Sequence, residues 1–452
     1  MNVELAHKRV TVAGAARSGL AAARLLAERG ARVTLSESQA DVPLAKPLEE
    51  IGVTLELGGH RLETFVDADL IVISPGVPPD QPVIQAARDR GVPVIAEIEL
   101  ASRFLQGRVI AITGTKGKST TTALAGRILA TAGFKVTVGG NIGEPLSAQV
   151  GLSTPDTFHV VETSSFQLEQ IDTFHPWISV MLNFSPDHLD RHPSVDAYRA
   201  AKGRIFENQD ERDWAVVNAD DPTVLEMARR GRARVRLFSR GGSIHGGTVV
   251  ERGWIIDRAD GRADVRLVPM DAVHLIGPHL VNDVMAAATV GLIAGAAPAA
   301  MTAAVDTFRG LEHAMEFVAQ IGDVRFVNDS KATNVESALR SIESFERDLV
   351  VILGGRFKGG DLRLLREPLE RRARAVVLIG ESRALFRDAL SDVVHVVEAD
   401  AFDAAVRAAY SLARPSGVVL LAPACASFDM FRDYAERGRR FKEEVSKLSH
   451  EL

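Results

Sequence analysis

The sequence predicts an α/β protein of three doubly wound, Rossmann-like domains with mainly parallel sheets, the central domain having a P-loop ATPase-type fold. Short apolar runs alternate with helix-forming segments over residues 1–105 and again over 312–452, and this alternation is typical of βαβ units around a parallel sheet. Between these regions a strand, a glycine turn and a helix follow one another at 109–130. The expected domains are residues 1–106, 107–311 and 312–452.

The composition narrows the class of protein. Hydrophobic residues make up 46% and charged residues 25% of the 452, as in an ordinary soluble globular protein. A net charge of −6 argues against nucleic-acid binding, which usually needs a basic face. The single cysteine, Cys425, cannot form an intramolecular disulfide and fits a reducing compartment. No signal-peptide core precedes the first strand, expected at Arg9–Ala13. We therefore expect a cytoplasmic protein, and we expect it to be a monomer.

The uncharged segment 284–305 raises the question of a membrane span. Alanine dominates the segment, and alanine drives insertion far less than leucine or isoleucine. Two glycines and Pro298 also interrupt it. We expect two buried helices with a break near Ala297, and no membrane association.

The stretch AITGTKGKSTT, at 111–121, predicts a phosphate site. Glycines between a strand and a helix N-terminus let backbone N–H groups converge on an anion, and the helix dipole adds to them. Lys118 would reach the β- and γ-phosphates, and a hydroxyl of Ser119 or Thr120 would hold Mg²⁺. The loop is a short G-x-x-G-K-[ST] form, since Ile112 stands where the common P-loop has its first glycine. The residues expected at ATP in this loop are Gly114, Thr115, Lys116, Gly117, Lys118, Ser119 and Thr120.

The first domain carries a weaker nucleotide signal. The turn GAARSG, from Gly14 to Gly19, resembles a dinucleotide fingerprint with Ala16 in place of the middle glycine. Glu37 ends the second strand, where a ribose or base contact is expected. A further turn, at Ser74 to Pro78, follows another strand and would face the same crevice. These features do not decide whether the first domain binds NAD, a UDP-sugar or no ligand.

Three more polar positions follow in the central region. Glu162 ends a strand beside the phosphate loop, where phosphoryl-transfer sites place a Mg²⁺ ligand. His188 lies in the segment DHLDRH, and Lys202 lies in a helical segment. Taken singly, each has an ordinary structural explanation: a strand end, a capping residue and a solvated helix face.

Five motifs occur together in the order TGTKGKSTT, GGNIGEP, ETSSFQLE, LNFSPDHLDRH and YRAAKGRIF. In this order and spacing they resemble the Mur ligases, the ATP-dependent amide-forming enzymes of peptidoglycan precursor synthesis. The likeness covers nearly the whole chain, and the short phosphate loop is the form that this family uses. The resemblance implies a ligase that serves cell-wall biogenesis, and with it cell shape and division.

The resemblance also implies catalytic and metal-binding roles. Lys202 matches a lysine that the family carbamylates, which agrees with the chemistry, because a lysine cation cannot ligate Mg²⁺ while a carbamate offers a hard oxygen. Two Mg²⁺ ions are expected with ATP. The implied catalytic residues are Lys118, Glu162, His188, Lys202 and Lys331. The implied metal ligands are Ser119, Glu162, His188 and the carbamylated Lys202.

Further positions match substrate-binding residues of the family. Asp329 and Lys331 lie in NDSKATN and are expected at the nucleotide, together with Asn282. The positions expected to bind the UDP-substrate, UDP-N-acetylmuramoyl-L-alanine, are Gly14, Arg17, Ser18, Glu37, Ser38, Ser74, Gly76, Asn141, Ser164 and Gln167.

The C-terminal domain indicates which amino acid is added. ACASFD, at 424–429, resembles an element of the D-glutamate-adding branch, and the D-N-P-R type motif of the branch that adds a diamino acid is not found in the sequence. One lysine and two hydroxyls suit a dicarboxylate. Gly354 to Gly360 lacks a hydroxyl after its lysine, so it does not predict a second nucleotide site. The implied D-glutamate residues are Thr333, Lys358, Ser427, Phe428 and Tyr434, in a domain that closes over ATP.

Two departures from the family pattern bear on the adenine and ribose contacts. In G-x-H-N-x-x-N the two usual asparagines are replaced by Leu280 and Asp283, unless a shifted register lets Asn282 serve. In H-R-x-E the arginine is replaced by Ala314. Another Mur ligase, or a relative of the folate polyglutamating enzymes with a different amino-acid specificity, remains an alternative. A nucleotide-binding module without ligase activity is a more remote alternative.

Overall fold

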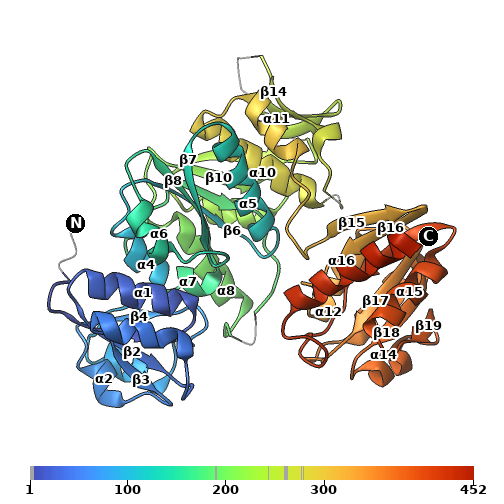
Figure 1. Ribbon diagram of the computed structural model, residues 1–452. Helices are drawn as coiled ribbons and strands as arrows, with labels where there is room; N and C mark the ends of the chain where they lie inside the picture. Colours follow the sequence, from blue (N-terminus) through green and yellow to red (C-terminus); the bar gives the residue numbers. More distant parts are fainter. Residues whose placement is uncertain are drawn as a thin grey trace. The chain divides into compact units, whose positions relative to one another are not determined.

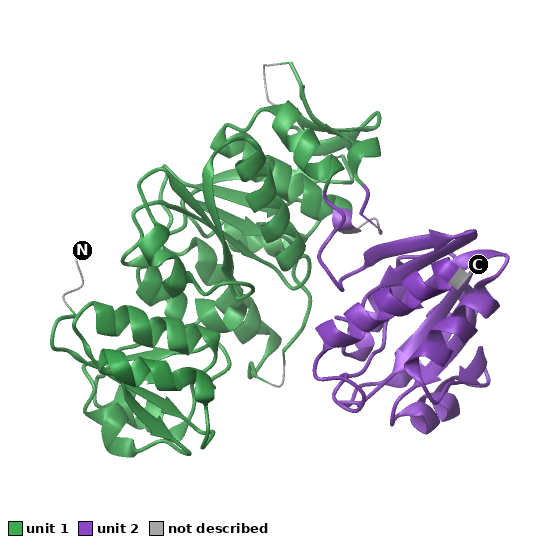
Figure 2. Ribbon diagram, in the orientation of Figure 1, with its two compact units in different colours: residues 1–273, 281–307 green, residues 274–280, 308–452 purple. Residues whose placement is uncertain are grey.

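The computed structural model describes residues 5–188, 191–242, 244–258, 263–275, 277 and 279–451. The chain forms two compact units, which are coloured separately in Figure 2. Unit 1 comprises Met1–Val273 and Val281–Thr307, and unit 2 comprises His274–Leu280 and Phe308–Leu452. Unit 1 holds two sheets and unit 2 holds one (Figure 1).

The first sheet is fully parallel, with strand order β3-β2-β1-β4-β5. Its central strands bury nearly every side chain because helices cover both faces. Gly14, at φ +93°, turns the chain from β1 into α1, and a Cβ on Gly19 would collide with the Gly14 carbonyl. The elements are β1 (Arg9–Ala13), α1 (Arg17–Glu28), β2 (Arg32–Glu37), η1 (Pro43–Ile51), β3 (Thr54–Leu57), α2 (Leu62–Val66), β4 (Leu70–Ile73), α3 (Pro82–Asp89), β5 (Val94–Ala96) and α4 (Glu97–Ser102).

The second sheet has nine strands in the order β14-β13-β12-β11-β10-β9-β6-β8-β7. It is parallel from β7 to β12, and antiparallel hairpins add β13 and β14 at one edge. The strands are β6 (Arg108–Thr113), β7 (Lys135–Gly140), β8 (Thr157–Glu162), β9 (Ile178–Met181), β10 (Trp214–Asn218), β11 (Arg234–Ser239), β12 (Gly247–Glu251), β13 (Trp254–Arg258) and β14 (Val265–Pro269). The helices are α5 (Lys118–Thr131), α6 (Leu146–Gln149), η2 (Val150–Leu152), α7 (Ser165–Leu168), α8 (Val195–Gly203), η3 (Arg204–Phe206), α9 (Pro222–Ala228), η4 (Met270–Ala272), α10 (His279–Ala294) and α11 (Pro298–Asp306).

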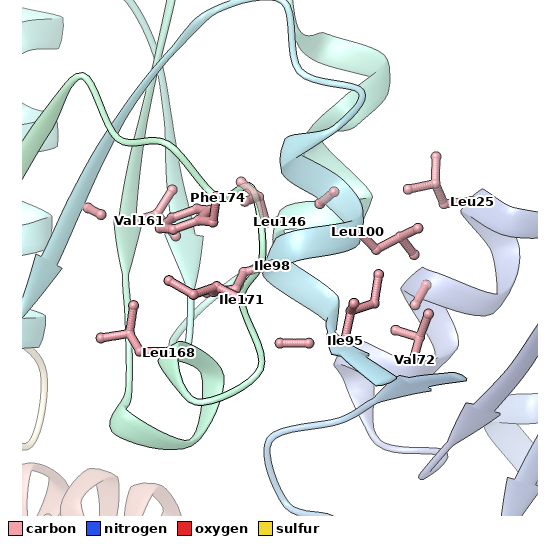
Figure 3. Close-up of a cluster of buried hydrophobic side chains, with 14 of the residues drawn as sticks. Leu25, Val72, Ile95, Ile98, Leu100, Leu146, Val161, Leu168, Ile171 and Phe174 are labelled. Carbon is pink, nitrogen blue, oxygen red and sulfur yellow. The ribbon is translucent and has the colours of Figure 1, made fainter. Parts of the chain in front are cut away.

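Helix α4 joins the first two sheets through one continuous apolar cluster. Ile98 and Leu100 of α4 lie between side chains of the first sheet, such as Val72, and side chains of the second, such as Val161 (Figure 3). Burial of this apolar surface stabilises the pairing of the two sheets. Glu99 of α4, which is completely buried, also accepts the backbone N–H groups of residues 172–174 at 2.7–3.0 Å.

The sheet of unit 2 has the order β15-β16-β20-β17-β18-β19, parallel except for the β15–β16 hairpin. Apolar clusters lie on its two faces. Its elements are β15 (Glu316–Ile321), β16 (Asp323–Asn328), α12 (Val335–Glu343), β17 (Leu349–Gly354), η5 (Leu362–Leu365), α13 (Arg366–Arg372), β18 (Ala373–Ile379), α14 (Arg383–Leu390), β19 (His395–Glu398), α15 (Phe402–Ala413), β20 (Ser416–Leu421) and α16 (Tyr434–Glu451).

The predicted fold class is confirmed, since the three sheets are mainly parallel and flanked by helices. The segment 284–305 forms parts of α10 and α11, with the break at Ala297 that its proline predicts. Among the described residues, no helix combines the length and the apolarity that a membrane crossing requires. The hairpins β12–β14 and strand β15 are additions that the βαβ pattern did not predict.

Candidate active site

The phosphate loop leaves β6 and enters α5, as the sequence predicts. Gly117, at φ +82°, caps the helix in a left-handed conformation that favours glycine. Lys118 is the first residue of α5, and its Nζ donates a hydrogen bond to the Thr115 carbonyl at 3.0 Å. Ser119 and Thr120 follow in the first turn and are half-exposed. The loop therefore presents a helix N-terminus, a lysine and hydroxyl groups on one side.

The segment after β9 holds this loop in shape. The Asn183 amide accepts from the Lys116 N–H at 2.9 Å and donates to the Lys116 carbonyl at 3.1 Å. The Thr115 hydroxyl exchanges hydrogen bonds with the backbone of Ser185, both at 3.0 Å. Lys116 itself forms an ion pair with Asp187 at 3.2 Å. The Lys116 side chain is therefore paired with Asp187. The hydrogen bonds from Asn183 and Ser185 fix the geometry of the loop backbone.

Glu162 ends β8 beside the loop and is 2% exposed. Its Oε1 accepts a hydrogen bond from the Asn141 amide at 2.9 Å, so Asn141 orients the carboxylate. Its Oε2 is buried and has no hydrogen-bond partner among the described residues. A buried carboxylate oxygen without a partner is costly, and it is the hard ligand that Mg²⁺ prefers.

Lys202 lies in α8 and is 2% exposed. Its Nζ donates to the Gly114 carbonyl at 2.8 Å and lies 4.9 Å from the centre of the Tyr198 ring. Burial and the charge of Lys118 lower the pKa of Lys202 well below its ordinary value, although Asp187 and Glu162 act in the opposite direction. The lysine therefore favours its neutral, nucleophilic form.

His188 is exposed and has a left-handed backbone at φ +55°. Its N–H donates to the Asp187 carboxylate at 3.0 Å, and its ring meets Phe166 edge to face at 5.2 Å. Phe166 belongs to α7, the helix that follows Glu162. The structure thus brings the segments that carry Glu162, His188 and Lys202 together beside the phosphate loop.

Helix α10 places an acid against the phosphate loop. Asp283 is 3% exposed, and a methyl group on Gly117 would collide with its Oδ1. Burial raises the pKa of Asp283 well above its ordinary value, while Thr121 and Lys118 act in the opposite direction. Asn282 is half-buried, and its Oδ1 has no partner among the described residues. The structure thus places Asp283 of α10 against Gly117.

The predicted UDP-substrate residues of the first domain meet at one edge of its sheet, at the ends of β1, β2 and β4. Glu37 accepts hydrogen bonds from the N–H of Ala15 at 2.8 Å and from the Ser38 hydroxyl at 2.8 Å. Burial would raise the pKa of Glu37, but these hydrogen bonds and that from Gln39 bring it below its ordinary value. Ser74 donates to the Gly14 carbonyl at 3.1 Å. Glu37 and Ser74 therefore stabilise the turn between β1 and α1.

The other residues predicted to bind the UDP-substrate lie in α1, in the turn that follows β4 and in the central domain. Arg17 is exposed and Ser18 is half-buried, both in the first turn of α1. Gly76 has open space where a side chain would begin. Ser164 caps α7, and its hydroxyl and N–H bond to the Gln167 side chain. The Gln167 Nε2 is buried without a partner among the described residues, beside a small cavity that Ser74 also lines.

In unit 2, the NDSKATN segment follows β16. Asp329 is 8% exposed and accepts from the Ser341 hydroxyl and from the Met315 N–H. Burial raises the pKa of Asp329 to about 6. Lys331 is exposed, and its backbone N–H donates a hydrogen bond to the His313 carbonyl at 3.0 Å. The side chain of Lys331 is thus presented to solvent.

The predicted D-glutamate residues follow β16, β17 and β20, which are neighbours in the sheet. The Nζ of Lys358 lies 3.4 Å from the Thr333 hydroxyl, and backbone bonds join the segments of Ala332 and Ala424 and those of Arg356 and Ala426. Ser427 is buried, whereas Phe428 and Tyr434 are 63% and 40% exposed. Lys358 and Thr333 therefore lie together at this edge of the sheet, and Phe428 and Tyr434 are exposed in the segment that follows β20.

Known proteins match this chain over its whole length. Residues 8–96 match the family model "Mur ligase MurD-like, N-terminal domain", residues 112–291 match "Mur ligase middle domain", and residues 313–425 match "Mur ligase, glutamate ligase domain". The UDP-N-acetylmuramoylalanine–D-glutamate ligase of Koribacter versatilis is 45% identical over 99% of both chains. The enzyme of that name from Acidobacterium capsulatum is 46% identical over 99% of this chain and 98% of its own.

Solved structures share the fold. The UDP-N-acetylmuramate–alanine ligase of Thermotoga maritima aligns with a TM-score of 0.59 at 19% identity, over 98% of this chain and 100% of its own. A pseudomurein peptide ligase from Methanothermus fervidus aligns with a TM-score of 0.57 at 20% identity, with the same coverage.

Three α/β domains and a short phosphate loop beside a buried glutamate and a buried lysine define an ATP-dependent ligase of the Mur type. The matches agree with this class, and they confirm the predicted joining of an acid to an amino acid in peptidoglycan synthesis. The chain belongs to the Mur ligase family, in the branch of the UDP-N-acetylmuramoylalanine–D-glutamate ligases.

Several residues with clear roles in the site geometry were not singled out from the sequence. Asn183, Asp187 and His192 lie within the motif LNFSPDHLDRH, from which the sequence predicts a role for His188 alone. Their contacts join segments that are distant in sequence, so no local pattern marks them. Asn183 follows β9, next to β6 in the sheet, and this adjacency is the one signal that could have found it.

Proposed function

We propose that this chain joins D-glutamate to the alanyl carboxylate of UDP-N-acetylmuramoyl-L-alanine with ATP, as a cytoplasmic monomer. The observation that carries the proposal is the buried Glu162 beside the phosphate loop, whose Oε2 has no hydrogen-bond partner in the described part of the chain. In this scheme the first domain binds the UDP end of the substrate and the central domain binds ATP. The third domain binds D-glutamate and closes over ATP, with Lys331 and Asp329 at the nucleotide.

The donors present suit Mg²⁺. Glu162 supplies a carboxylate oxygen, Ser119 a hydroxyl, and His188 an imidazole at the rim, where a second ion would be held. A bound Mg²⁺ neutralises charge on the phosphoryl oxygens as the phosphoryl group transfers. Asn141 supports the set by fixing the Glu162 carboxylate at 2.9 Å, as outer partners of metal ligands commonly do.

Carbamylation of Lys202 completes the ligand set. A neutral amine attacks CO₂ and loses a proton, which gives an N-carboxylate with two oxygen atoms. The lowered pKa of Lys202 favours the neutral amine, and its burial protects the product from water. The charges of Glu162 and Asp187 act on the pKa of Lys202, and a carbamate there would add a hard oxygen to the Mg²⁺ ligands that Glu162 and Ser119 offer.

The chemistry needs the carboxylate oxygen of the substrate to attack the γ-phosphate, which yields an acyl phosphate and ADP. A free carboxylate is a poor electrophile because oxide would have to leave, whereas phosphate leaves readily. Lys118 stabilises the charge that develops on the phosphoryl group. The D-glutamate amine then attacks the acyl carbon, and phosphate leaves through a tetrahedral intermediate.

ADP release with UDP-N-acetylmuramoyl-L-alanine tests the proposal. We expect turnover with D-glutamate and little with L-alanine, L-lysine or meso-diaminopimelate. Lys118→Ala should lose about 3 kcal/mol or more of transition-state stabilisation, whereas Lys135→Ala, which removes an exposed lysine of the same domain, should not. Equal rates for all amino acids, or full activity of Lys118→Ala, would contradict the assignment.

A further inference from the structure

The imidazole of His192 lies at the centre of a buried cluster that none of the proposed catalytic roles uses. His192 is 2% exposed. Its Nε2 lies 2.9 Å from the Ser165 hydroxyl, and its Nδ1 lies 3.0 Å from Oε1 of Glu169. The Nδ1 forms no hydrogen bond within the described residues, so Glu169 is a close neighbour of the ring, whereas Nε2 and the Ser165 hydroxyl form a hydrogen bond.

Two aromatic side chains also lie against the His192 ring. Phe166 stacks on it with a centroid distance of 5.1 Å and an interplanar angle of 13°. Tyr198 lies 5.1 Å away at an angle of 51°. The ring is therefore held by stacking on Phe166, by contact with Tyr198 and by the Ser165 hydroxyl at Nε2.

The partners of His192 come from the three segments that carry the proposed metal ligands. Ser165 and Phe166 begin α7, three and four residues after Glu162. The His192 N–H donates to the His188 carbonyl at 2.9 Å. Tyr198 lies one helical turn before Lys202 in α8, and its ring lies 4.9 Å from the Lys202 Nζ. One side chain thus ties all three ligand-bearing segments to each other.

The same cluster reaches the phosphate loop and the first domain. The Tyr198 hydroxyl lies 3.3 Å from the Thr115 hydroxyl of the loop. Arg191, next to His192, stacks its guanidinium over Phe166 at 4.4 Å and donates to the Val77 carbonyl at 3.4 Å. Val77 adjoins Gly76 in the turn that is expected to bind the UDP-substrate.

We infer that His192 is a positioning residue that sets the mutual placement of Glu162, His188 and Lys202, and so the affinity of the metal site. The inference rests on the proposed function, because it needs those three residues to be the ligands. His192 itself touches neither substrate nor metal in this scheme. Removing partners that orient metal ligands typically costs 10–100-fold in metal affinity or activity.

The chain offers a matched control for a histidine exchange. His159 lies in β8, is fully buried, and has a hydroxyl at each nitrogen, with Thr137 at 2.7 Å and Ser153 at 2.8 Å. It lies in the strand that ends at Glu162, but its side-chain hydrogen bonds go to Thr137 and Ser153, outside the cluster around His192. His159→Phe therefore reports the general cost of replacing a buried, doubly bonded histidine by an apolar ring.

The experiment is a titration of the full chain with Mn²⁺ in the presence of ADP, with free Mn²⁺ followed by electron paramagnetic resonance. His192→Phe keeps the stacked ring but removes both nitrogens, and we expect its dissociation constant for Mn²⁺ to rise about 10-fold or more. Ser165→Ala should give a smaller rise, and His159→Phe should bind Mn²⁺ like the wild type. Thermal unfolding and the kcat of each variant are measured alongside.

The outcomes separate the inference from the proposed function. Wild-type Mn²⁺ affinity in His192→Phe, or an equal loss in His159→Phe, would overturn the role of His192. If His192→Phe does not fold, Ser165→Ala decides, and an unchanged Mn²⁺ affinity in it overturns the inference. Glu162→Gln tests the ligand set itself: an unchanged Mn²⁺ affinity in that variant rejects the proposed metal site, whatever His192→Phe does.

Discussion

The Nζ of Lys202 donates a hydrogen bond of 2.8 Å to the carbonyl oxygen of Gly114. Lys202 is buried, with 2% of its surface exposed. The hydrogen bond places the amine beside the first residue of the phosphate loop. A buried amine with a lowered pKa is destabilising when it is charged, and carbamylation replaces that cation by a carboxylate, which a bound Mg²⁺ would offset.

Carbamylation of Lys202 predicts that activity depends on CO₂. The rate should fall in CO₂-depleted buffer and recover when bicarbonate is added, because the carbamate forms from neutral amine and CO₂. Lys202→Ala should be nearly inactive, and a short carboxylic acid should restore part of its rate by filling the gap. An intact mass that shows unmodified Lys202 in active, metal-bound enzyme would count against the carbamate.

The direction of the Lys202 pKa shift predicts a pH dependence of stability in the unmodified protein. The folded state disfavours the charged amine, so the penalty is full below the folded-state pKa and disappears as pH rises toward the ordinary lysine pKa. Lys202→Met lacks this group, so its advantage in Tm over the unmodified wild type should shrink as pH rises. A difference in Tm that is constant with pH would refute this reading of the pKa.

At position 283 we expect a neutral amide to replace the acid without loss of ATP binding. Burial raises the pKa of Asp283, so the folded protein favours its neutral form, which Asn mimics. Asp283→Asn should keep the KM for ATP within about threefold of the wild-type value, whereas Asp283→Leu should raise it far more. The folded-state penalty on the ionised acid begins above pH 3.8, so Asp283→Asn should gain Tm over the wild type as pH rises. Equal damage in both variants would show that the charge itself is needed.

Glu97 and Glu99 of α4 should respond oppositely to replacement by glutamine. Both are buried, but burial raises the pKa of Glu97 to about 7, and its Oε2 has no partner among the described residues. Burial also acts to raise the pKa of Glu99, yet hydrogen bonds from Asp172, Thr173 and Arg103 outweigh it and lower that pKa. Glu99 therefore stabilises the joint between the first two sheets as an anion, and Glu97 does not.

Unfolding in urea at pH 5 and pH 8 checks this pair. The penalty on ionised Glu97 grows as pH rises from 4.5 to about 7, so Glu97→Gln should gain up to about 3 kcal/mol over the wild type at pH 8 and little at pH 5. Glu99→Gln should lose about 3 kcal/mol at pH 8. The lowered pKa of Glu99 means that this loss diminishes as pH falls through that value. A gain for Glu97→Gln that is as large at pH 5 as at pH 8 would be inconsistent with the raised pKa.

Local patterns in the sequence predict the phosphate loop, the strand that ends at Glu162 and the helix that carries Lys202, because each depends on neighbouring residues. What the patterns do not predict is how these parts are held. Asn183, just after β9, stabilises the loop from 67 residues away, and His192 joins α7 to α8 through side-chain contacts. Glu37, expected at the ribose, also accepts a hydrogen bond from the turn that precedes α1. Such contacts depend on tertiary packing, which a one-dimensional pattern does not encode.

The last prediction concerns the amino-acid site of unit 2. Lys358 is exposed, and its Nζ lies 3.4 Å from the Thr333 hydroxyl, so both side chains are available to a carboxylate. A charge-assisted hydrogen bond contributes about 1.5–3 kcal/mol, so Lys358→Ala should raise the KM for D-glutamate about 10-fold or more. The KM for ATP should change little. Arg356→Ala is the matched control, because Arg356 lies in the same loop and pairs with Glu381 at 3.1 Å. Initial rates at saturating ATP and UDP-substrate measure the effect, and a rise confined to the KM for ATP would place Lys358 at the nucleotide instead.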